Sequence, residues 1–418
     1  MNKFIESAGK NIRWFENSGV MRPADGFWGV AERLVALDIE ESIRQEIVEK
    51  FASRTMLKNS FAVESRRPDC NFETAVMFLL YGILAQDEQC FTTGENLLDY
   101  LYFRSAMKRS KTHKLPCAWR WSHVILSADG HWFDDNSWCI ILQCVLRNAF
   151  PELDQKYQAG DAALTLAGHL NAAVARIMES SPDEKGEMND PDKVWIGNLR
   201  LPHWGGLSVF ALSCIHSLYH KPEYLPAIRK YLLQLKNELP GFSTSEYAYA
   251  MMGAVAAAEA FGDETAREVA LLSRDLLLKA ADPVTGTLPS SHYEAPSGKA
   301  LADLIYTLNW SLLGLQMFCR FAPEDKDAGT LLDKQLALVM DIQDDSPDAE
   351  FNGCWRGMYD MEQHSWGGGN LYEGGSSSIY SGWTNAPIST ALLLAHAGIS
   401  LLELSGIKKF SGFSIVNS

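Results

Sequence analysis

The chain has 418 residues, a mass of 46.5 kDa and 47% hydrophobic residues, enough for a large buried core. Its formal net charge is −15, and Lys and Arg form no cluster, which excludes the phosphate-neutralising surface that nucleic-acid binding requires. The longest apolar stretch, residues 388–402, contains polar residues and is too short to span a bilayer, so no membrane partner is expected.

The first 19 residues contain no apolar core of a signal peptide, so we expect a cytoplasmic protein unless a leader has been removed. None of the eight cysteines belongs to a Cys-x-x-Cys pair, and several lie in apolar helical runs, which predicts free buried thiols. His216 and His220 share the four-residue spacing of a helix, but no third ligand accompanies them. Neither a metal nor another cofactor is therefore expected.

Apolar residues at spacings of three and four predict helices along the whole chain, whereas strand signals are weak and brief. The predicted helices cover residues 43–52, 72–84, 96–107, 137–150, 162–178, 206–219, 223–236, 245–261, 264–281, 299–320, 331–342 and 389–404. They pair with a short link inside each pair and a longer link between pairs. Twelve helices in six hairpins predict an all-α fold, an (α/α)6 toroid that forms a single domain over residues 1–418; an open α-solenoid is the alternative.

Three of the longer links are rich in aromatic and charged residues: 114–135, 195–206 and 352–387. The hairpin pattern predicts that they gather at one end of the ring. Indole and phenol rings can stack on the face of a sugar, and polar side chains can bind its hydroxyl rim, so these loops favour a carbohydrate ligand. The candidates in the third loop are Trp355, Arg356, Trp366, Tyr372, Glu373 and Trp383. The alternative is a loop that packs on itself and closes the ring.

The segment His131-Trp-Phe-Asp-Asp-Asn-Ser-Trp138 leads into a predicted helix and places Asp134 beside Asp135. One acidic residue is enough to cap a helix, and capping is the ordinary alternative. Two adjacent carboxylates flanked by Trp132 and Trp138 exceed that need. Glycoside cleavage uses one carboxyl group as an acid and a second as a base or nucleophile, and apolar neighbours would raise the pKa of one of them.

This Asp-Asp-Asn-x-Trp segment resembles the Asp-Asp-x-x-Trp signature of the six-hairpin glycosidases, and most of all the endo-α-1,6-mannanases. The chain is also similar to the unsaturated glucuronyl hydrolases in its helix count and aromatic loops. The resemblance implies that Asp134 and Asp135 are catalytic. It is incomplete, because one Trp instead of two follows the pair, which leaves mannan open as the substrate. Neighbouring helical residues point about 100° apart, so Glu373 is kept as a further catalytic carboxylate.

The remaining candidates are substrate-binding residues. Arg120 lies between two Trp residues, and Arg356 follows Trp355, an arrangement that suits either an acidic sugar or an Arg stacked within the wall. His203 and Trp204 precede a predicted helix and are expected at the rim, where His203 would relay protons or have a structural role. Tyr249 lies at the start of the next helix, where Glu246 is interpreted as part of a capping box.

These patterns together predict a glycoside hydrolase that cleaves an oligosaccharide or glycoside by carboxylate general acid/base catalysis, with a uronic-acid residue as one option. Three other classes stay open. A sugar epimerase or isomerase of the N-acylglucosamine 2-epimerase type would depend on His123, His203, His292 or His364. The others are a carbohydrate-binding protein without catalytic activity and a polysaccharide lyase. The sequence does not determine the oligomeric state.

Overall fold

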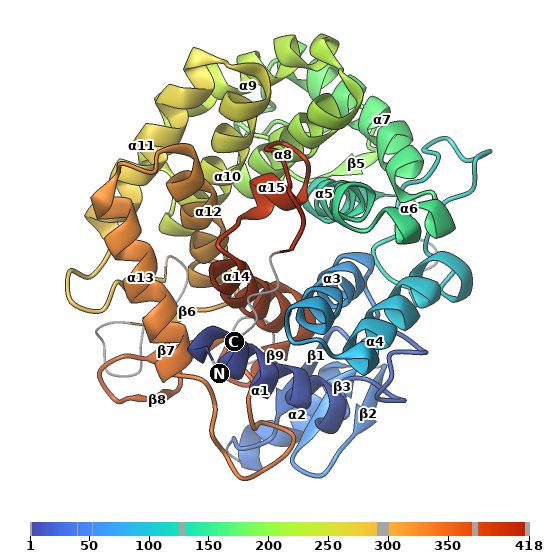
Figure 1. Cartoon of the computed structure of the whole chain (residues 1–418), viewed down its shortest axis with the longest axis vertical. Coiled ribbons are helices and arrows are strands. Elements are labelled where there is room, and N and C mark those ends of the chain that lie inside the picture. The colour runs from blue at the N-terminus through green and yellow to red at the C-terminus, as the bar shows by residue number, and fades with distance from the viewer. Residues whose placement is uncertain are drawn as a thin grey trace.

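The computed structural model describes residues 2–39, 41–51, 53–124, 130–290, 301–369 and 375–413. Its helices form two concentric rings, as Figure 1 shows. The inner ring closes on itself, because each inner helix contacts the next and the last contacts the first. The inner helices are α3 (Pro68–Leu84), α5 (Phe133–Ala149), α8 (Pro202–Tyr219), α10 (Thr244–Phe261), α12 (Leu308–Phe321) and α14 (Ala386–Ala397).

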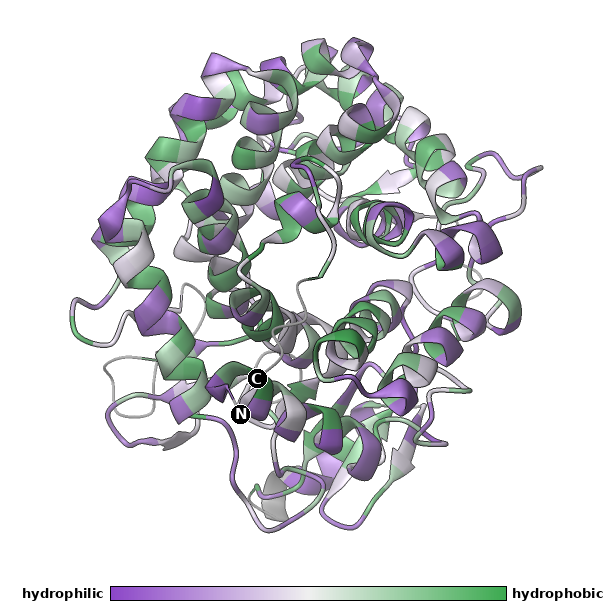
Figure 2. Ribbon diagram, in the orientation of Figure 1, coloured by the Kyte–Doolittle hydropathy of each residue, from purple (hydrophilic) through white to green (hydrophobic). Residues whose placement is uncertain are grey.

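The outer ring packs one helix against each part of the inner ring. Its helices are α1 (Lys3–Asn17), α4 (Glu88–Asp99), α7 (Ala159–Glu179), α9 (Leu225–Glu238), α11 (Glu264–Ala280) and α13 (Lys326–Asp341). The difference between the rings follows from their sequences. Inner helices are apolar on nearly every side, whereas an outer helix such as α9 buries one stripe only, and Figure 2 shows this contrast in hydropathy. The predicted (α/α)6 toroid is therefore confirmed.

The direction of the inner helices follows from the lengths of the links. Short links join the C-terminus of an inner helix to an outer helix, as between α3 and α4 or between α10 and α11. Most of the links that lead into the N-terminus of an inner helix are long. The six inner helices therefore all begin at the same end of the ring, where the three aromatic loops also lie.

A short helix, α15 (Leu401–Leu404), covers the other end of the ring and lies over its centre in Figure 1. Asn148 at the end of α5 donates to the backbone oxygens of Glu403 and Leu404 at 2.8 and 3.0 Å. Arg320 at the end of α12 donates to the Glu403 carboxylate at 2.7 Å. The C-terminal ends of two inner helices therefore hold α15 across this end of the ring.

The described strands are short and lie in the long links. β1 (Arg33–Ala36), β2 (Arg54–Met56), β3 (Ser60–Val63) and β9 (Ser378–Tyr380) form an antiparallel sheet in the order β2-β3-β1-β9. β4 (His131–Trp132) pairs with β5 (Trp195–Ile196), and β6 (Leu301–Asp303) with β7 (Met358–Asp360) and β8 (Ser365–Trp366). The four-stranded sheet and α2 (Glu41–Lys50) share a small core of their own around Val35 and Phe61. This sheet stands beside the open end of the ring.

Several predicted helix boundaries are wrong. The helix predicted over 299–320 begins only at Leu308, because Leu301–Asp303 pairs with β7 instead. The helix predicted over 389–404 is divided by Gly398, whose φ of +67° ends α14. The helix predicted over 96–107 ends as a π-helical turn, η1 (Tyr100–Arg104). Shorter elements complete the description: α6 (Pro151–Tyr157), η2 (Pro222–Tyr224), η3 (Leu239–Gly241) and the π-turn η4 (Ser381–Asn385).

All eight cysteines are free thiols, and all but Cys319 are buried, as the sequence predicts. Within the described ranges, every helix is too short or too polar to cross a bilayer.

Candidate active site

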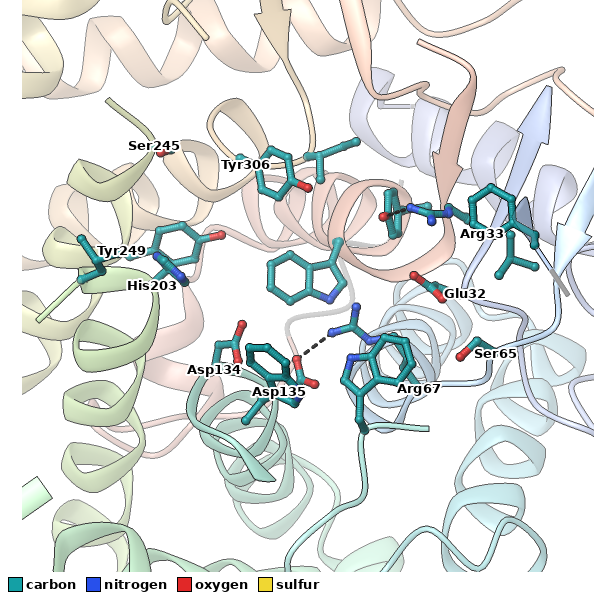
Figure 3. A pocket seen from close by; sticks show the side chains of 18 of the residues that line it. Glu32, Arg33, Ser65, Arg67, Asp134, Asp135, His203, Ser245, Tyr249 and Tyr306 are labelled. Atoms are coloured by element: carbon teal, nitrogen blue, oxygen red, sulfur yellow. Dashed lines mark hydrogen bonds and ion pairs between the residues drawn. The ribbon is translucent and has the colours of Figure 1, made fainter. Parts of the chain in front are cut away.

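A cavity of about 790 Å³ opens where the inner helices begin. Each of the six helices contributes a residue from its first turns or from the segment directly before it, and Figure 3 shows most of these side chains from close by. They are Arg67, Asp134, Asp135, His203, Ser245, Glu246, Tyr249, Tyr306 and Trp383. Helix N-termini carry partial positive charge, so six of them together favour acidic side chains at this end.

Other segments complete the cavity wall. Trp121 and Trp132 come from the link before α5, and Glu32, Arg33 and Tyr380 come from the four-stranded sheet and the residue before it. The cavity is therefore lined by several aromatic rings together with carboxylates. A sugar ring, which has apolar faces and a rim of hydroxyl groups, matches this combination.

The two aspartates expected to be catalytic lie side by side in the first turn of α5 and both line the cavity. Arg67 holds one of them: its Nη2 donates to Oδ1 of Asp135 at 2.7 Å and to Oδ2 of Asp69 at 2.8 Å. Oδ1 of Asp134 and Oδ2 of Asp135 are buried without a hydrogen-bond partner among the described residues. Buried acceptors of this kind usually find a partner, which here points to a hydroxyl group or water in the cavity.

The electrostatic surroundings separate the two carboxyl groups. Burial raises the pKa of Asp135 well above its usual value. Arg67 acts to lower this pKa, whereas the charges of Asp69 and Asp134 raise it further. Burial also raises the pKa of Asp134, but His203 and then Arg67 act against that rise. Burial thus raises the pKa of both carboxyl groups, and each has its own opposing cation: Arg67 for Asp135, and His203 first for Asp134.

His203 is the second residue of α8 and is held by a carboxylate. Its Nδ1 lies 2.6 Å from Oε1 of Glu246, and its backbone N–H donates to Oε2 of the same residue at 2.8 Å. Burial lowers the pKa of His203, but Glu246 and Asp134 outweigh that effect and raise it. Trp204 packs on the His203 ring with a centroid separation of 3.9 Å and does not line the cavity itself.

Trp383 lies in the π-turn before α14 with φ of +46°, a left-handed conformation that costs free energy for a residue with a side chain. Its backbone N–H donates to Oε2 of Glu73 at 3.0 Å, and its indole N–H donates to Oδ2 of Asp69 at 2.5 Å. The Arg67 guanidinium lies 5.3 Å from its ring centroid. These contacts fix the indole at the cavity wall beside the Asp pair.

Several expected substrate contacts are wrong. Trp138 is buried and donates to Glu73 at 2.6 Å, so it supports the cavity floor from behind. Trp355 is fully buried, and its indole N–H donates to the backbone oxygen of Val339. Arg356 forms ion pairs with Asp38 and Asp344 away from the cavity. Each of these side chains is used in the core or in a salt bridge.

Arg120 and Trp366 are also absent from the cavity wall, and Trp366 packs edge-on against Tyr359. Tyr372 and Glu373 lie outside the described residues, as does His292. The structure thus brings together Asp134, Asp135, Trp132, His203, Tyr249 and Trp383 of the sequence candidates.

The sequence candidates also omit residues that the cavity includes. Arg67 directly precedes Pro68, the first residue of α3, and lines the cavity. The sequence predicts that Glu246 caps its own helix, α10. Its carboxylate instead accepts a hydrogen bond from the backbone N–H of His203 and so caps α8. Glu32, Arg33 and Tyr380 depend on short strands that periodicity does not reveal.

No family model matches the sequence, and no curated protein matches it either. Solved structures do match in fold. A cellobiose 2-epimerase from Bacillus thermoamylovorans B4167 has 11% identity and a TM-score of 0.58 over 94% of this chain and 100% of that one. A D-mannose isomerase has 11% identity and a TM-score of 0.57 over 94% and 98%.

An α-1,6-mannanase of Salegentibacter sp. HEL1_6 is also similar, with 10% identity and a TM-score of 0.51 over 97% of this chain and 100% of that one. That structure is an inactive variant in which two consecutive aspartates are replaced by Asn, in complex with α-1,6-mannotriose. At these identities the likeness shows the fold alone. The chain has the (α/α)6 toroid that glycoside hydrolases share with sugar epimerases and isomerases.

Proposed function

We propose that the protein is a glycoside hydrolase in which Asp134 and Asp135 carry out the reaction. The observation that carries the proposal is the pair itself: two buried carboxyl groups with raised pKa values on a cavity wall rich in Trp and Tyr, each with an oxygen that no described residue bonds to. The mannanase of the same fold is inactive when two consecutive aspartates are replaced, which supports a similar role for consecutive aspartates here.

The two residues would have different roles. Asp135, whose pKa burial raises well above its usual value, would protonate the oxygen of the leaving group. Asp134 would stay ionised beside His203 and would activate water or attack the anomeric carbon. Trp383 and Trp132 would stack on the sugar rings. Arg120 and Arg356, the two Arg residues behind the uronic-acid option, do not line the cavity, whereas Arg33 and Arg67 do, so the substrate screen has to include neutral and acidic sugars.

The test is a screen of aryl glycosides and oligosaccharides, α-1,6-mannotriose included, with Asp134→Asn and Asp135→Asn measured beside the wild type. We expect release of sugar by the wild type and a loss of about 10²–10⁴-fold in either variant, the usual effect of removing a general acid or base. Asp275→Asn, on the exposed side of the outer helix α11, is the matched control and should keep full activity. Retention of wild-type rates in both active-site variants would exclude this mechanism.

A sugar epimerase or isomerase is the second candidate, and the His203–Glu246 pair favours it, since a His oriented by a carboxylate can act as a base. Such a reaction also needs a second group across the ring carbon. In the described part of the chain, His203 is the only His that lines the cavity, and His123 and His364 lie elsewhere. This favours hydrolysis.

Incubation with cellobiose or mannose in D₂O separates the two reactions. An epimerase would release the isomeric sugar with deuterium at the reacting carbon and would lose that activity in His203→Asn. A hydrolase would leave free mannose unchanged. A carbohydrate-binding protein without catalytic activity would bind oligosaccharides with no turnover at all.

A further inference from the structure

Glu246 spans two inner helices at the cavity. It belongs to the first turn of α10, yet both of its carboxylate oxygens bond to His203 at the start of α8, one to the ring and one to the backbone. The side chains of Glu246 and His203 are 9% and 24% exposed. A carboxylate that needed only to cap α8 would bond to the backbone N–H and would leave the ring free.

The position of His203 makes its charge depend on this contact. A cation near the N-terminus of a helix is disfavoured by the helix dipole, and burial disfavours it as well. The charged groups that face His203 are Glu246 from α10 and Asp134 from α5, and both are acidic. Tyr249 of α10 faces the ring at a centroid distance of 6.1 Å, and Tyr231 of α9 lies near Glu246. Glu246 and Asp134 are therefore the groups that stabilise the protonated form of the His203 ring.

The hydrogen bond also fixes the orientation of the ring. An ionised carboxylate only accepts, so Nδ1 must be the donor to Glu246. Among the described residues, none is bonded to Nε2, the other ring nitrogen. Figure 3 shows His203 and Asp134 on the same side of the cavity. An imidazole that carries protons on both nitrogens would offer Asp134 a positive charge.

We propose that Glu246 is a positioning residue that keeps His203 doubly protonated and turned toward the cavity, where its charge keeps Asp134 ionised. The consequence for catalysis rests on the proposed function; the protonation of His203 does not. Each member of the Asp pair then has its own cation, since Asp135 is bonded to Arg67. Glu246 thereby separates the roles of two otherwise similar carboxyl groups.

The protonation is tested by NMR on the full chain with ¹³C-labelled histidine. The His203 signal is identified by its loss in His203→Gln, and the other nine histidines serve as internal references. In the wild type, the titration midpoint of His203 should lie above the ordinary histidine value of about 6.5. In Glu246→Gln its midpoint should fall by about one pH unit or more, the effect of removing a bonded opposite charge. An unchanged midpoint in Glu246→Gln, or a wild-type midpoint at or below the ordinary value, would overturn the proposal.

Kinetics provides the second readout. In Glu246→Gln, Asp134 loses its cation, so the acidic limb of the pH–rate profile should move to higher pH while KM changes less than kcat. Glu246→Asp keeps the charge and should restore the position of that limb. Glu238→Gln, which breaks a contact with Arg200 away from the cavity, is the matched control.

A purely structural cap would behave differently: Glu246→Gln would lower the Tm and leave both the His203 midpoint and the pH profile unchanged, and that result would refute the inference. If no glycoside is cleaved under any condition, the hydrolase proposal fails, but the NMR titration still decides the role of Glu246. If Glu246→Gln does not fold, the wild-type titration and Glu246→Asp decide it.

Discussion

Replacement of Arg67 by Met is the perturbation whose effect follows most directly from the structure. Arg67 bonds to two buried carboxyl groups, Asp69 and Asp135, which are 0% and 2% exposed. Removal of Arg67 from its buried pair with Asp69 costs about 3–5 kcal/mol, because the charge left on that carboxylate has no compensation. An unfolding entropy of about 2.1 cal/mol/K per residue over 418 residues gives about 0.9 kcal/mol/K, so the Tm should fall by about 3–6 °C at pH 7.5.

The same reasoning fixes the sign of the pH dependence. Without Arg67, the pKa of Asp135, which burial already raises, rises further in the folded state, whereas its value in the unfolded chain does not change. The folded variant then binds more protons than the unfolded chain at neutral pH, so its stability improves relative to the wild type as the pH falls toward the unfolded value of about 3.9. The difference in Tm should therefore be smaller at pH 5.0 than at pH 7.5.

Thermal unfolding followed by circular dichroism at the two pH values is the assay. Arg67→Lys is the control: it keeps one charge but lacks the planar fork that reaches two carboxylates, so its Tm should fall between those of the wild type and Arg67→Met. A Tm within 1 °C of the wild type at pH 7.5, or a loss of the same size at both pH values, would refute the reasoning.

Three further predictions concern the cavity and its surroundings. Because burial raises the pKa of Asp134, its ionised form destabilises the folded state, and this destabilisation grows as the pH rises above about 3.9. Asp134→Asn should therefore have a higher Tm than the wild type at pH 8. In a melting series, this difference in Tm should vanish near pH 4. Trp383→Phe loses the indole hydrogen bond to Asp69 and should raise the KM for a cleaved oligosaccharide by about tenfold with a smaller change in kcat; an unchanged KM in initial-rate measurements would count against stacking at this position. Arg356→Met removes the ion-pair partner of buried Asp344 and should lower the Tm by a few degrees while KM stays the same. A selective rise in KM for uronic-acid substrates would instead indicate that Arg356 binds the substrate.

The sequence predicts the ring well, because the inner helices are apolar over most of their length, and Gly262 and Gly398 mark the ends of two of them. It misses the four-stranded sheet, since runs such as Arg33–Ala36 are too short for their periodicity to differ from that of a loop. The first helix, Lys3–Asn17, was not predicted either, although Asn2 caps it and its apolar residues recur every three or four positions.

Six of the sequence candidates line the cavity, and three of them, Asp134, Asp135 and His203, lie in the first turn of an inner helix. Within the long loop before α14, composition does not separate a Trp in the core from one at the wall: Trp355 and Trp383 lie in similar Gly-rich surroundings, yet only the π-turn exposes the second to the cavity. Contacts between helices, such as Glu246 with His203, have no signature in one sequence.

Because the six inner helices all point the same way, the residues that line the cavity lie at one end of the ring, apart from much of the packing that stabilises the fold. Residues at the start of each helix can change without disturbing the apolar turns that follow, while α15 and the short links secure the opposite end. A new reaction then requires substitutions at only a few first-turn positions, each already aimed at the same space. Because so few positions need to change, the same fold can serve an epimerase, an isomerase and a mannanase, each of which has only 10–11% sequence identity to this chain.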